Sequence, residues 1–339
     1  MLKVAAFTGG LNDPSARFRL RQYIPILKKQ DIEVTDFYSK VGKYPPRNKL
    51  MRPLWAFVTL SMRIPDILKS YNYNITVLQR EMLSTFKTFE LFTKSPRILD
   101  VDDAIWLHKD GKFINMIAAN CDAVICGNKY IADYFSKINN SIYILPTGVD
   151  INRYKSINTK NTTIKNIIGW MGTSGGFKYL YKIEKAISII LKKYSNAKLR
   201  VVSDRMPKFS LIKNNQLEFI KWSSEIEIKS LQDILVGIMP LEDSLWERGK
   251  CSYKMLLYMA CEKPTIVSPV GMNNDILLQG NVGLKAKTID DWVECFEILL
   301  TKPKLAAKMG REGRKVVIEN YSLQKLSNEF SKILFKFAN

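Results

Sequence analysis

The stretch RGKCSYKMLLYMACEKPTIVSPVG, residues 248–271, combines a glycine turn, an apolar helix-like segment and a short run of branched residues. Gly249 and Lys250 open it, and Lys263 and Pro264 separate the apolar segment from the branched residues. The spacing predicts a helix followed by a buried strand. A turn, a helix and a strand in this order form half of a βαβ unit, so the stretch predicts a parallel sheet covered by helices.

The same alternation of strand-like and helix-like segments runs through almost the whole chain. The expected strands are residues 2–7, 32–37, 75–79, 97–101, 123–126, 142–145, 167–171, 198–202, 217–220, 234–239 and 265–268. We expect helices over residues 17–29, 179–194 and 322–337. A polar segment, SINTKNTTIK at residues 156–165, divides the strands into two series and predicts a linker.

The fold class that follows is α/β, with two tandem doubly wound, Rossmann-like domains that face a central cleft. We assign residues 1–160 to the first domain, 161–321 to the second, and 322–339 to a helix that returns to the first. In such sheets the ligand lies outside the carboxyl ends of the strands, so the loops that follow the strands should build the site.

Composition narrows the classes of function. The formal net charge of +20 predicts attraction to an anion, unless the lysines merely solvate the surface. Five scattered cysteines and a single histidine argue against a zinc site or a Ser-His-Asp triad, and the cysteines suit a reducing cytoplasm. No nucleic-acid-binding motif, export signal or membrane-spanning segment is evident, so we expect a cytoplasmic protein that does not bind nucleic acid.

Two loops of the second half suggest phosphate binding. The first is GTSGGFKYL at residues 172–180, in which Gly172, Thr173, Ser174 and Gly175 precede Lys178. Glycines allow a close backbone approach and a helix start offers free N–H groups, although an ordinary tight turn has the same sequence.

The second loop is the quoted stretch itself. Lys250 and Lys254 should lie together on the first helical turn, with Ser252 as the cap. Cations are unfavourable at that positive end unless an anion also binds there. The alternative is that both lysines are simply solvated.

Three stretches of the first half carry polar residues after strands. Gly9 and Gly10 form a turn that leads to Arg17 and Arg19, and Asp100, Asp102 and Asp103 end the strand at 97–101. The acids resemble a metal-binding DxD, but we favour Asp102 or Asp103 as a polar site residue over a metal ligand. His108 follows them and is either an acceptor-side residue or structural.

Several of these segments together resemble the GT-B glycosyltransferases of family 4, group 1. The resemblance is carried by LPTGVDINRY at 145–154, the quoted stretch, and MGREGRKVVIENYSLQKL at 309–326. The shorter LQRE, IGWMGT and DVDDAIW resemble a branch from bacterial polysaccharide clusters, including those for lipopolysaccharide. The resemblance implies transfer of a sugar, with retention of configuration and without a metal or cofactor, from a nucleotide diphosphate donor to a glycan or polyprenyl-linked acceptor.

The resemblance also assigns roles to residues. It implies that the donor lies on the second domain and the acceptor on the first. The expected catalytic residues are Lys250, Lys178, Asp102 and Arg17. The expected donor-binding residues are Gly172, Thr173, Ser174, Gly175, Ser203, Arg205, Trp222, Glu247, Gly249, Cys251, Ser252 and Lys254. The expected acceptor-side residues are Gly9, Gly10, Arg19, Asp103 and His108.

One departure from the family leaves other functions open. The family carries two glutamates eight residues apart, and the corresponding positions here are Gly249 and Leu257. The nearby acids that could substitute for them are Glu242, Asp243 and Glu247. A subunit that binds the donor with little or no activity, or a nucleotide-sugar epimerase of the same fold, remains as an alternative.

Residues 41–69 are both basic and apolar. They hold six lysines and arginines against the single acid Asp66, with Trp55 and Phe57 among them. Such a segment gains energy near an anionic leaflet, so we expect peripheral contact with the inner face of the cell membrane. The alternative is a helix that packs on the sheet and exposes a solvated basic edge.

Overall fold

The structure is a computed structural model that describes residues 1–338 except residues 43, 85 and 157–164. The contacts divide these residues into two compact units. Unit 1 comprises Met1–Gly148, Arg248–Cys251 and the C-terminal segment from Leu323, and unit 2 comprises Val149–Glu247 and Ser252–Ser322. Most of the predicted linker at 156–165 lies outside the described residues.

Unit 1 contains a six-stranded parallel sheet in the order β2-β1-β3-β4-β5-β6. Its described strands are β1 (Leu2–Thr8), β2 (Ile32–Tyr38), β3 (Ile75–Gln79), β4 (Arg97–Val101), β5 (Ala123–Cys126) and β6 (Ile142–Ile144). Its described α-helices are α1 (Pro14–Arg19), α2 (Ile24–Lys28), α3 (Arg52–Ser70), α4 (Lys112–Ala119), α5 (Lys129–Phe135) and α14 (Leu323–Ala338). Nearly all residues of β1, β3 and β5 are buried, as expected for strands covered on both faces.

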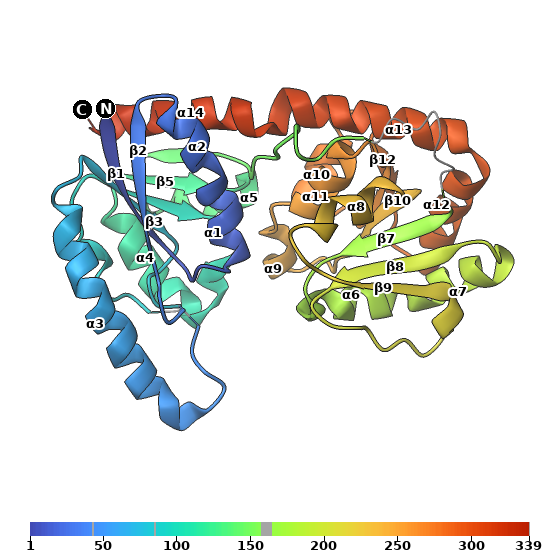
Figure 1. The fold of residues 1–339 in the computed structure, drawn as a ribbon, viewed down its shortest axis with the longest axis horizontal. Helices are drawn as coiled ribbons and strands as arrows, with labels where there is room; N and C mark the ends of the chain where they lie inside the picture. Colours follow the sequence, from blue (N-terminus) through green and yellow to red (C-terminus); the bar gives the residue numbers. More distant parts are fainter. Residues whose placement is uncertain (43, 85, 157–164, 339) are drawn as a thin grey trace. The chain divides into compact units, whose positions relative to one another are not determined.

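Unit 2 repeats the architecture with the order β12-β11-β10-β7-β8-β9, again parallel (Figure 1). Its described strands are β7 (Ile167–Met171), β8 (Lys198–Ser203), β9 (Leu217–Lys221), β10 (Val236–Met239), β11 (Thr265–Val267) and β12 (Gly283–Lys285). Its described α-helices are α6 (Phe177–Lys182), α7 (Glu184–Lys193), α8 (Ile226–Gln232), α9 (Leu245–Arg248, whose last residue belongs to unit 1), α10 (Tyr253–Ala260), α11 (Met272–Leu277), α12 (Ile289–Thr301) and α13 (Pro303–Val316).

The C-terminal helix α14 completes the core of unit 1. Leu326, Phe330 and Leu334 are buried in one cluster with residues of β1, β3 and α2. The Phe330 ring meets the Tyr23 ring edge-on, with centroids 5.7 Å apart. Each buried side chain of this size contributes about 1.5–3 kcal/mol, so α14 is an integral part of unit 1.

Two predicted helices are in fact interrupted. The segment 17–29 contains α1, a 3₁₀ turn at Arg21–Tyr23 and then α2. Pro25 explains the break, because its ring lacks an N–H and clashes with the carbonyl group four residues earlier. The predicted helix at 179–194 likewise divides into α6 and α7, with Ile183 between them in a non-helical conformation.

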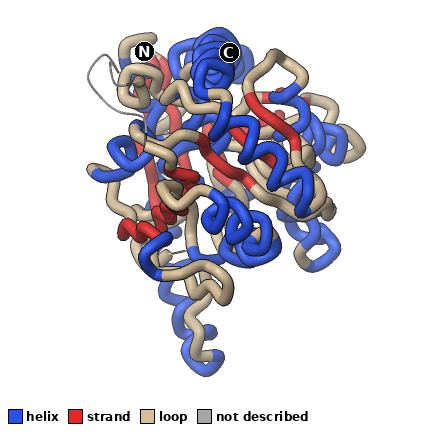
Figure 2. The backbone as a smooth tube through the Cα atoms, turned by 90° about the vertical axis from the view of Figure 1, so that its right-hand side faces the viewer, coloured by secondary structure: helices blue, strands red, loops and turns tan. Residues whose placement is uncertain are grey.

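Helix α3 stands out from the rest of unit 1. Figure 1 shows it running along one side of the sheet, and in Figure 2 the same end of the molecule again projects beyond the strands. The side chain of Arg63 fixes the helix, because it donates hydrogen bonds to the carbonyl oxygens of Thr8 (2.6 Å) and Phe37 at the ends of β1 and β2. Burial lowers the pKa of Arg63 to about 10.

Candidate functional site

The glycine loop after β7 brings a lysine against the backbone of unit 2. A β-carbon at Gly172 would lie 2.9 Å from the Trp170 ring and 3.0 Å from the Lys254 Nζ, so only glycine fits there. The Lys254 Nζ itself lies 4.9 Å from the centroid of the Trp170 ring. The fold therefore brings together two of the predicted donor-binding elements, the loop at 172–175 and Lys254.

The loop already holds a carboxylate. Asp204, which follows β8, accepts hydrogen bonds from the Ser174 backbone N–H (2.6 Å) and hydroxyl (2.9 Å). These bonds, led by the backbone one, hold the pKa of Asp204 below its ordinary value. Arg205 pairs with the same carboxylate at 3.2 Å. The geometry shows that the loop binds an anionic group, and that Asp204 occupies its donors.

The start of α10 differs from the prediction. Ser252 does not cap the helix, because its φ of 50° is left-handed and its side chain makes no capping bond. Its Oγ is buried and has no hydrogen-bond partner among the described residues. Lys254 lies in the first turn, whereas Lys250 lies outside the helix and in unit 1, so the prediction of both lysines on one turn is wrong.

Glu247 lies in unit 2 and is almost fully buried. It accepts hydrogen bonds from the hydroxyl groups of Tyr179 and Ser244. Burial would raise the pKa of Glu247, but these two bonds outweigh it and lower the pKa. The Lys178 Nζ lies 3.7 Å from the same carboxylate.

The other predicted donor residues follow β8 and β9. Ser203 is buried and its hydroxyl bonds to Asp204, while its carbonyl accepts the Trp222 backbone N–H at 2.9 Å. Trp222 itself is 43% exposed. Ser203, Arg205 and Trp222 thus share one edge of the sheet with the loop at 172–175.

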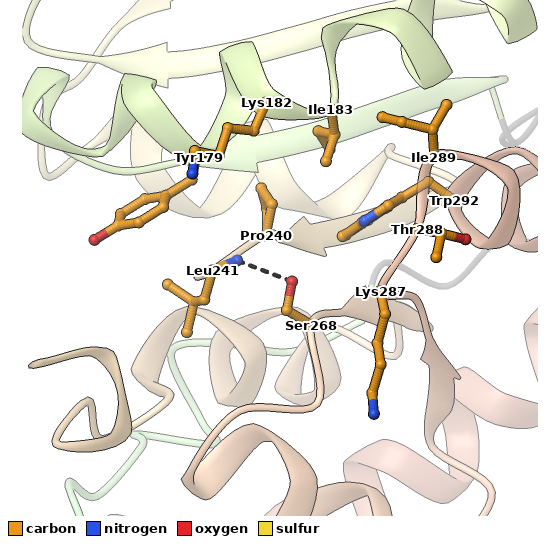
Figure 3. A pocket seen from close by; sticks show the side chains of 10 residues that line it. All are labelled: Tyr179, Lys182, Ile183, Pro240, Leu241, Ser268, Lys287, Thr288, Ile289 and Trp292. Carbon is orange, nitrogen blue, oxygen red and sulfur yellow. Dashed lines mark hydrogen bonds between the residues drawn. The ribbon is translucent and has the colours of Figure 1, made fainter. Parts of the chain in front are cut away.

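A cavity of about 310 Å³ lies elsewhere at the carboxyl edge of the same sheet (Figure 3). Figure 3 shows side chains from α6, from the loops after β10 and β11, and from the start of α12 around it. The lining residues are Tyr179, Lys182, Ile183, Pro240, Leu241, Ser268, Lys287, Thr288, Ile289 and Trp292. None of these residues was an expected site residue, although Tyr179 lies in the predicted phosphate-binding loop at 172–180.

In unit 1 the acids after β4 form a compact charged network. The Arg80 guanidinium donates to Asp102 at 2.6 Å and to Asp103 at 3.1 Å. The Lys250 Nζ lies 3.0 Å from the other Asp103 oxygen, and the Ser15 hydroxyl donates to Asp102. Two predicted catalytic residues, Asp102 and Lys250, therefore belong to one network in unit 1.

The segment 248–251 fits tightly into unit 1. A β-carbon at Gly249 would lie 2.6 Å from the backbone nitrogen of Ala104. The Asn128 amide donates to the carbonyl oxygens of Gly249 and Lys250, both at 3.1 Å. The Cys251 thiol donates to the Asp102 carbonyl at 3.2 Å, and burial raises its pKa. Gly249 and Cys251 are thus parts of the packing that places Lys250.

The predicted acceptor-side residues are not all available to a ligand. Arg19 is only 4% exposed and binds Asp100 through two nitrogens, so its guanidinium is used inside the fold. Gly9 and Gly10 follow β1 at the sheet edge, and a β-carbon at Gly9 would clash with Asp13. Arg17 is half-buried and lies against the Phe18 ring, while His108 is exposed.

Part of the chain matches a known protein family, and nearly all of it resembles solved structures. Residues 165–302 match the family of glycosyl transferases group 1. The chain resembles sucrose-phosphate synthase from Thermosynechococcus elongatus over 99% of both chains, at 14% identity and a TM-score of 0.72. It also resembles WaaG, a glycosyltransferase involved in lipopolysaccharide biosynthesis, over 98% of this chain and 99% of that one, at 12% identity and a TM-score of 0.67. The resemblance to HepE from Anabaena, solved with UDP and glucose, covers 98% of this chain and 99% of that one, at 11% identity and a TM-score of 0.68.

The chain has the GT-B fold, and residues 165–302 match a family of glycosyltransferases. The structural likenesses establish the GT-B fold, and the family match covers much of unit 2. No curated protein is similar enough in sequence to match.

The two positions where the family resemblance expects glutamates are both occupied by closely packed residues. Gly249 has no room for a side chain beside Ala104, and Leu257 is a buried residue of the helix that supports the site. Glu247 is the acid nearest to them in the chain whose carboxylate is buried, but Tyr179 and Ser244 engage it. Among the described residues, no cluster of three or more His, Cys, Asp or Glu side chains could hold a metal ion.

Two residues that were not individually predicted, Arg80 and Asp204, lie beside predicted site residues. Arg80 joins Asp102 to Asp103, and Asp204 fills the glycine loop. Both are single residues directly after a strand, which is the signal that drew attention to Asp102. Because β3 and β4 are neighbours in the sheet, a basic residue directly after β3 is a natural partner for the acids after β4.

The charged network predicts a pH dependence of stability. Burial would raise the pKa of Asp102, but the charges of Arg80 and Arg19 and the bonds from Arg80 and Ser15 hold it well below the ordinary value. A lowered carboxyl pKa stabilises the fold fully above the unfolded value of about 4 and loses that contribution as the pH falls below it. Chemical unfolding of wild type and Asp102→Asn should therefore show a gap that is constant from pH 5 to 7 and narrows towards pH 2.5. A gap that widens on acidification would contradict the assignment.

Proposed function

We propose that this glycosyltransferase transfers a sugar, with retention of configuration, from a nucleotide diphosphate sugar to a glycan on a lipid carrier. The setting we propose is the synthesis of a bacterial surface polysaccharide at the cytoplasmic face of the cell membrane. The observation that carries the donor half of the proposal is the start of α10. There a buried Ser252 hydroxyl has no partner among the described residues and Lys254 lies in the first helical turn.

An anion at the start of α10 accounts for both features. The helix N-terminus carries a partial positive charge, so a cation in its first turn is unfavourable by itself. A diphosphate would offset the Lys254 charge and accept the Ser252 hydroxyl bond. HepE, which shares the fold, has been solved with UDP-glucose, and that supports a nucleotide-sugar donor.

The chemistry we assign to the residues is electrostatic. Loss of the sugar leaves a growing negative charge on the nucleotide diphosphate, and fixed cations stabilise it most in a site that excludes water. We assign this role to Lys254, Lys178 and Lys250, without a metal or cofactor. Asp102 and Arg17 are the proposed polar residues on the acceptor side.

A second candidate is a subunit that binds the donor with little turnover. It is favoured by Gly249 and Leu257, where the fold leaves no place for the two carboxylates of the family. Donor binding is common to both candidates, whereas release of the nucleotide diphosphate in response to an acceptor belongs to the transferase alone.

The donor proposal predicts a specific stabilisation by nucleotide. A thermal-shift screen against UDP-, GDP-, ADP-, dTDP- and CMP-sugars should find one nucleotide that raises the Tm of the wild type by several degrees. Lys254→Gln should weaken that response at least tenfold in ligand concentration, because a charge-assisted bond contributes about 1.5–3 kcal/mol. Lys185→Gln, at an exposed position on α7, is the matched control and should respond like the wild type. An unchanged response in Lys254→Gln would place the donor elsewhere.

Membrane contact is proposed from the inverted character of α3. Its buried stripe is Thr59, Arg63, Ile67 and Ser70, most of them polar. Its outward face instead carries large apolar side chains with high exposed fractions: Leu54 56%, Phe57 69%, Ile64 46% and Leu68 66%. Such a helix hides its polar residues and presents its apolar ones.

The charges of this segment support an anionic bilayer as the partner of α3. Lys49, just before α3, and Arg52 and Lys69, at its two ends, are exposed, and Asp66 is the single acid of residues 41–69. Each cation near an acidic leaflet contributes about 1 kcal/mol, and the apolar side chains add to this when they enter the interface. No helix in the described part of the chain is long and apolar enough to cross a bilayer.

A further inference from the structure

The cavity shown in Figure 3 lies where three neighbouring strands of unit 2 end. Pro240 follows β10, Ser268 follows β11 and Lys287 follows β12. Ligands of open parallel sheets bind outside these carboxyl ends. The volume of about 310 Å³ is at the lower end of the range of about 300–1,000 Å³ for small-molecule pockets. The cavity therefore suits a small ligand, and none of the expected donor-binding residues lines it.

The walls of the cavity are mostly apolar. Figure 3 shows the Trp292 ring extending from the start of α12 toward Pro240, with Ile183 beside them. Leu241 and Ile289 add further apolar surface. A ligand with an apolar ring would gain free energy by removing its own surface and these side chains from water.

Two buried polar groups on the cavity have a hydrogen without an acceptor. Trp292 is 1% exposed, and its indole N–H makes no hydrogen bond to any described residue. Ser268 is 7% exposed; its Oγ accepts the Leu241 N–H at 3.0 Å, but its own hydroxyl hydrogen has no acceptor in the described part of the chain. Buried donors are normally paired, so a ligand oxygen in the cavity would satisfy them.

The charged groups at the rim favour a negative ligand. The exposed Lys287 ammonium forms no ion pair with a described residue, and its flexible stem, which extends away from the cavity in Figure 3, would turn back toward a bound anion. The nearby carboxylates are already engaged. Glu242 pairs with Lys182, and Asp291 accepts the backbone N–H groups of Lys287 and Thr288, both at 2.9 Å. The groups left for a ligand are therefore donors and a cation.

We propose that this cavity binds a small organic anion, a carboxylate or a phosphate ester, whose body is an apolar ring. The ring lies among Ile183, Pro240 and Trp292, and the acidic oxygens accept the Trp292 N–H and the Ser268 hydroxyl. The Lys287 ammonium offsets the negative charge at the rim. The site is independent of the proposed transfer of a sugar, because unit 2 alone forms it and the expected donor-binding residues lie outside it.

Four probes separate the features of the ligand. Benzoate and phenyl phosphate share the ring and differ in the acidic group, benzyl alcohol keeps the ring without the charge, and inorganic phosphate keeps the charge without the ring. Calorimetric titration of the full chain should show one site for benzoate, phenyl phosphate or both, with a Kd of about 1 mM or below. Benzyl alcohol should bind about tenfold more weakly, because it forms no charge-assisted hydrogen bonds. Inorganic phosphate should not compete.

Three variants connect the binding to this cavity. Lys287→Gln removes the cation at an exposed position, and Trp292→Phe removes the indole N–H. Each should weaken the tighter anion about tenfold, and Lys287→Gln should bind benzyl alcohol like the wild type. Lys285→Gln is the matched control, since this exposed lysine of β12 does not line the cavity, and it should bind like the wild type. Ser268→Ala replaces Trp292→Phe if that variant does not fold.

Competition with a nucleotide separates this site from the donor site. A saturating concentration of whichever nucleotide stabilises the wild type should leave the affinity for the anion unchanged. Anion binding that the nucleotide abolishes would overturn the proposal, as would equal affinity for benzoate and benzyl alcohol, unchanged affinity in both Lys287→Gln and Trp292→Phe, or no binding of either anion. A wild type that binds the anion but no nucleotide would refute the proposed function and support the anion site.

Discussion

Asp100→Ala is expected to lower the free energy of unfolding of unit 1 by about 3–5 kcal/mol, since it leaves a buried cation without its partner. The side chains of Arg19 and Asp100 are only 2% and 7% exposed. Arg19 binds both carboxylate oxygens of Asp100 and also donates to the Leu145 carbonyl at 2.7 Å. The pair links α1 to β4 and to the end of β6, so its loss should destabilise several strands of the sheet.

Urea unfolding of the full chain measures this effect. The control is Asp133→Ala, which breaks the exposed pair between Lys129 and Asp133 on α5 and should cost about 0.5 kcal/mol or less. The double variant Arg19→Leu, Asp100→Leu removes both charges and should recover much of the stability of the wild type. A cost for Asp100→Ala no larger than that of Asp133→Ala would show that the buried pair is not a structural anchor.

Phe57→Glu combined with Leu68→Glu is expected to reduce binding to anionic vesicles by more than tenfold. Both side chains are on the exposed face of α3 and about two-thirds exposed, so neither change should disturb the core. The carboxylates add repulsion from the acidic leaflet and remove apolar surface from the interface. Binding by the wild type should also weaken between 0.05 and about 0.5 M salt, as screening shortens the range of the charges.

Co-sedimentation with vesicles of phosphatidylglycerol and phosphatidylcholine provides the measurement. Ile189→Glu is a matched control, since it adds a charge at an exposed apolar position on α7 in unit 2. It should leave binding unchanged. Loss of binding in both variants, or in neither, would contradict a membrane role for α3, and self-association through α3 would appear as a larger particle in sedimentation without vesicles.

Much of the fold was predictable because its signals are local. The strands of a parallel sheet are short buried runs, and β1, β3, β4, β5 and β7 follow the expected ranges within a residue or two. The C-terminal helix was predictable for the same reason, as its apolar spacing is regular. The three-residue strand β12 was not predicted, since a segment so short has no recognisable period.

The arrangement of the candidate site depends on contacts that sequence patterns do not contain. Asp103 and Lys250 are 147 positions apart, and no pattern in either segment predicts that their side chains pair. The left-handed backbone of Ser252 similarly reversed a reasonable prediction of a helix cap. The residue types were informative, whereas their partners were decided by tertiary packing.

Release of nucleotide diphosphate by the purified chain is the most direct test of the transferase proposal. The assay uses the nucleotide sugar that raises the Tm most, with and without an extract of bacterial lipid-linked glycans, and includes Lys254→Gln. We expect slow release without acceptor, release at least tenfold faster with it, and loss of both in the variant. Tight donor binding by the wild type without acceptor-dependent release would contradict the transferase proposal and favour a donor-binding subunit.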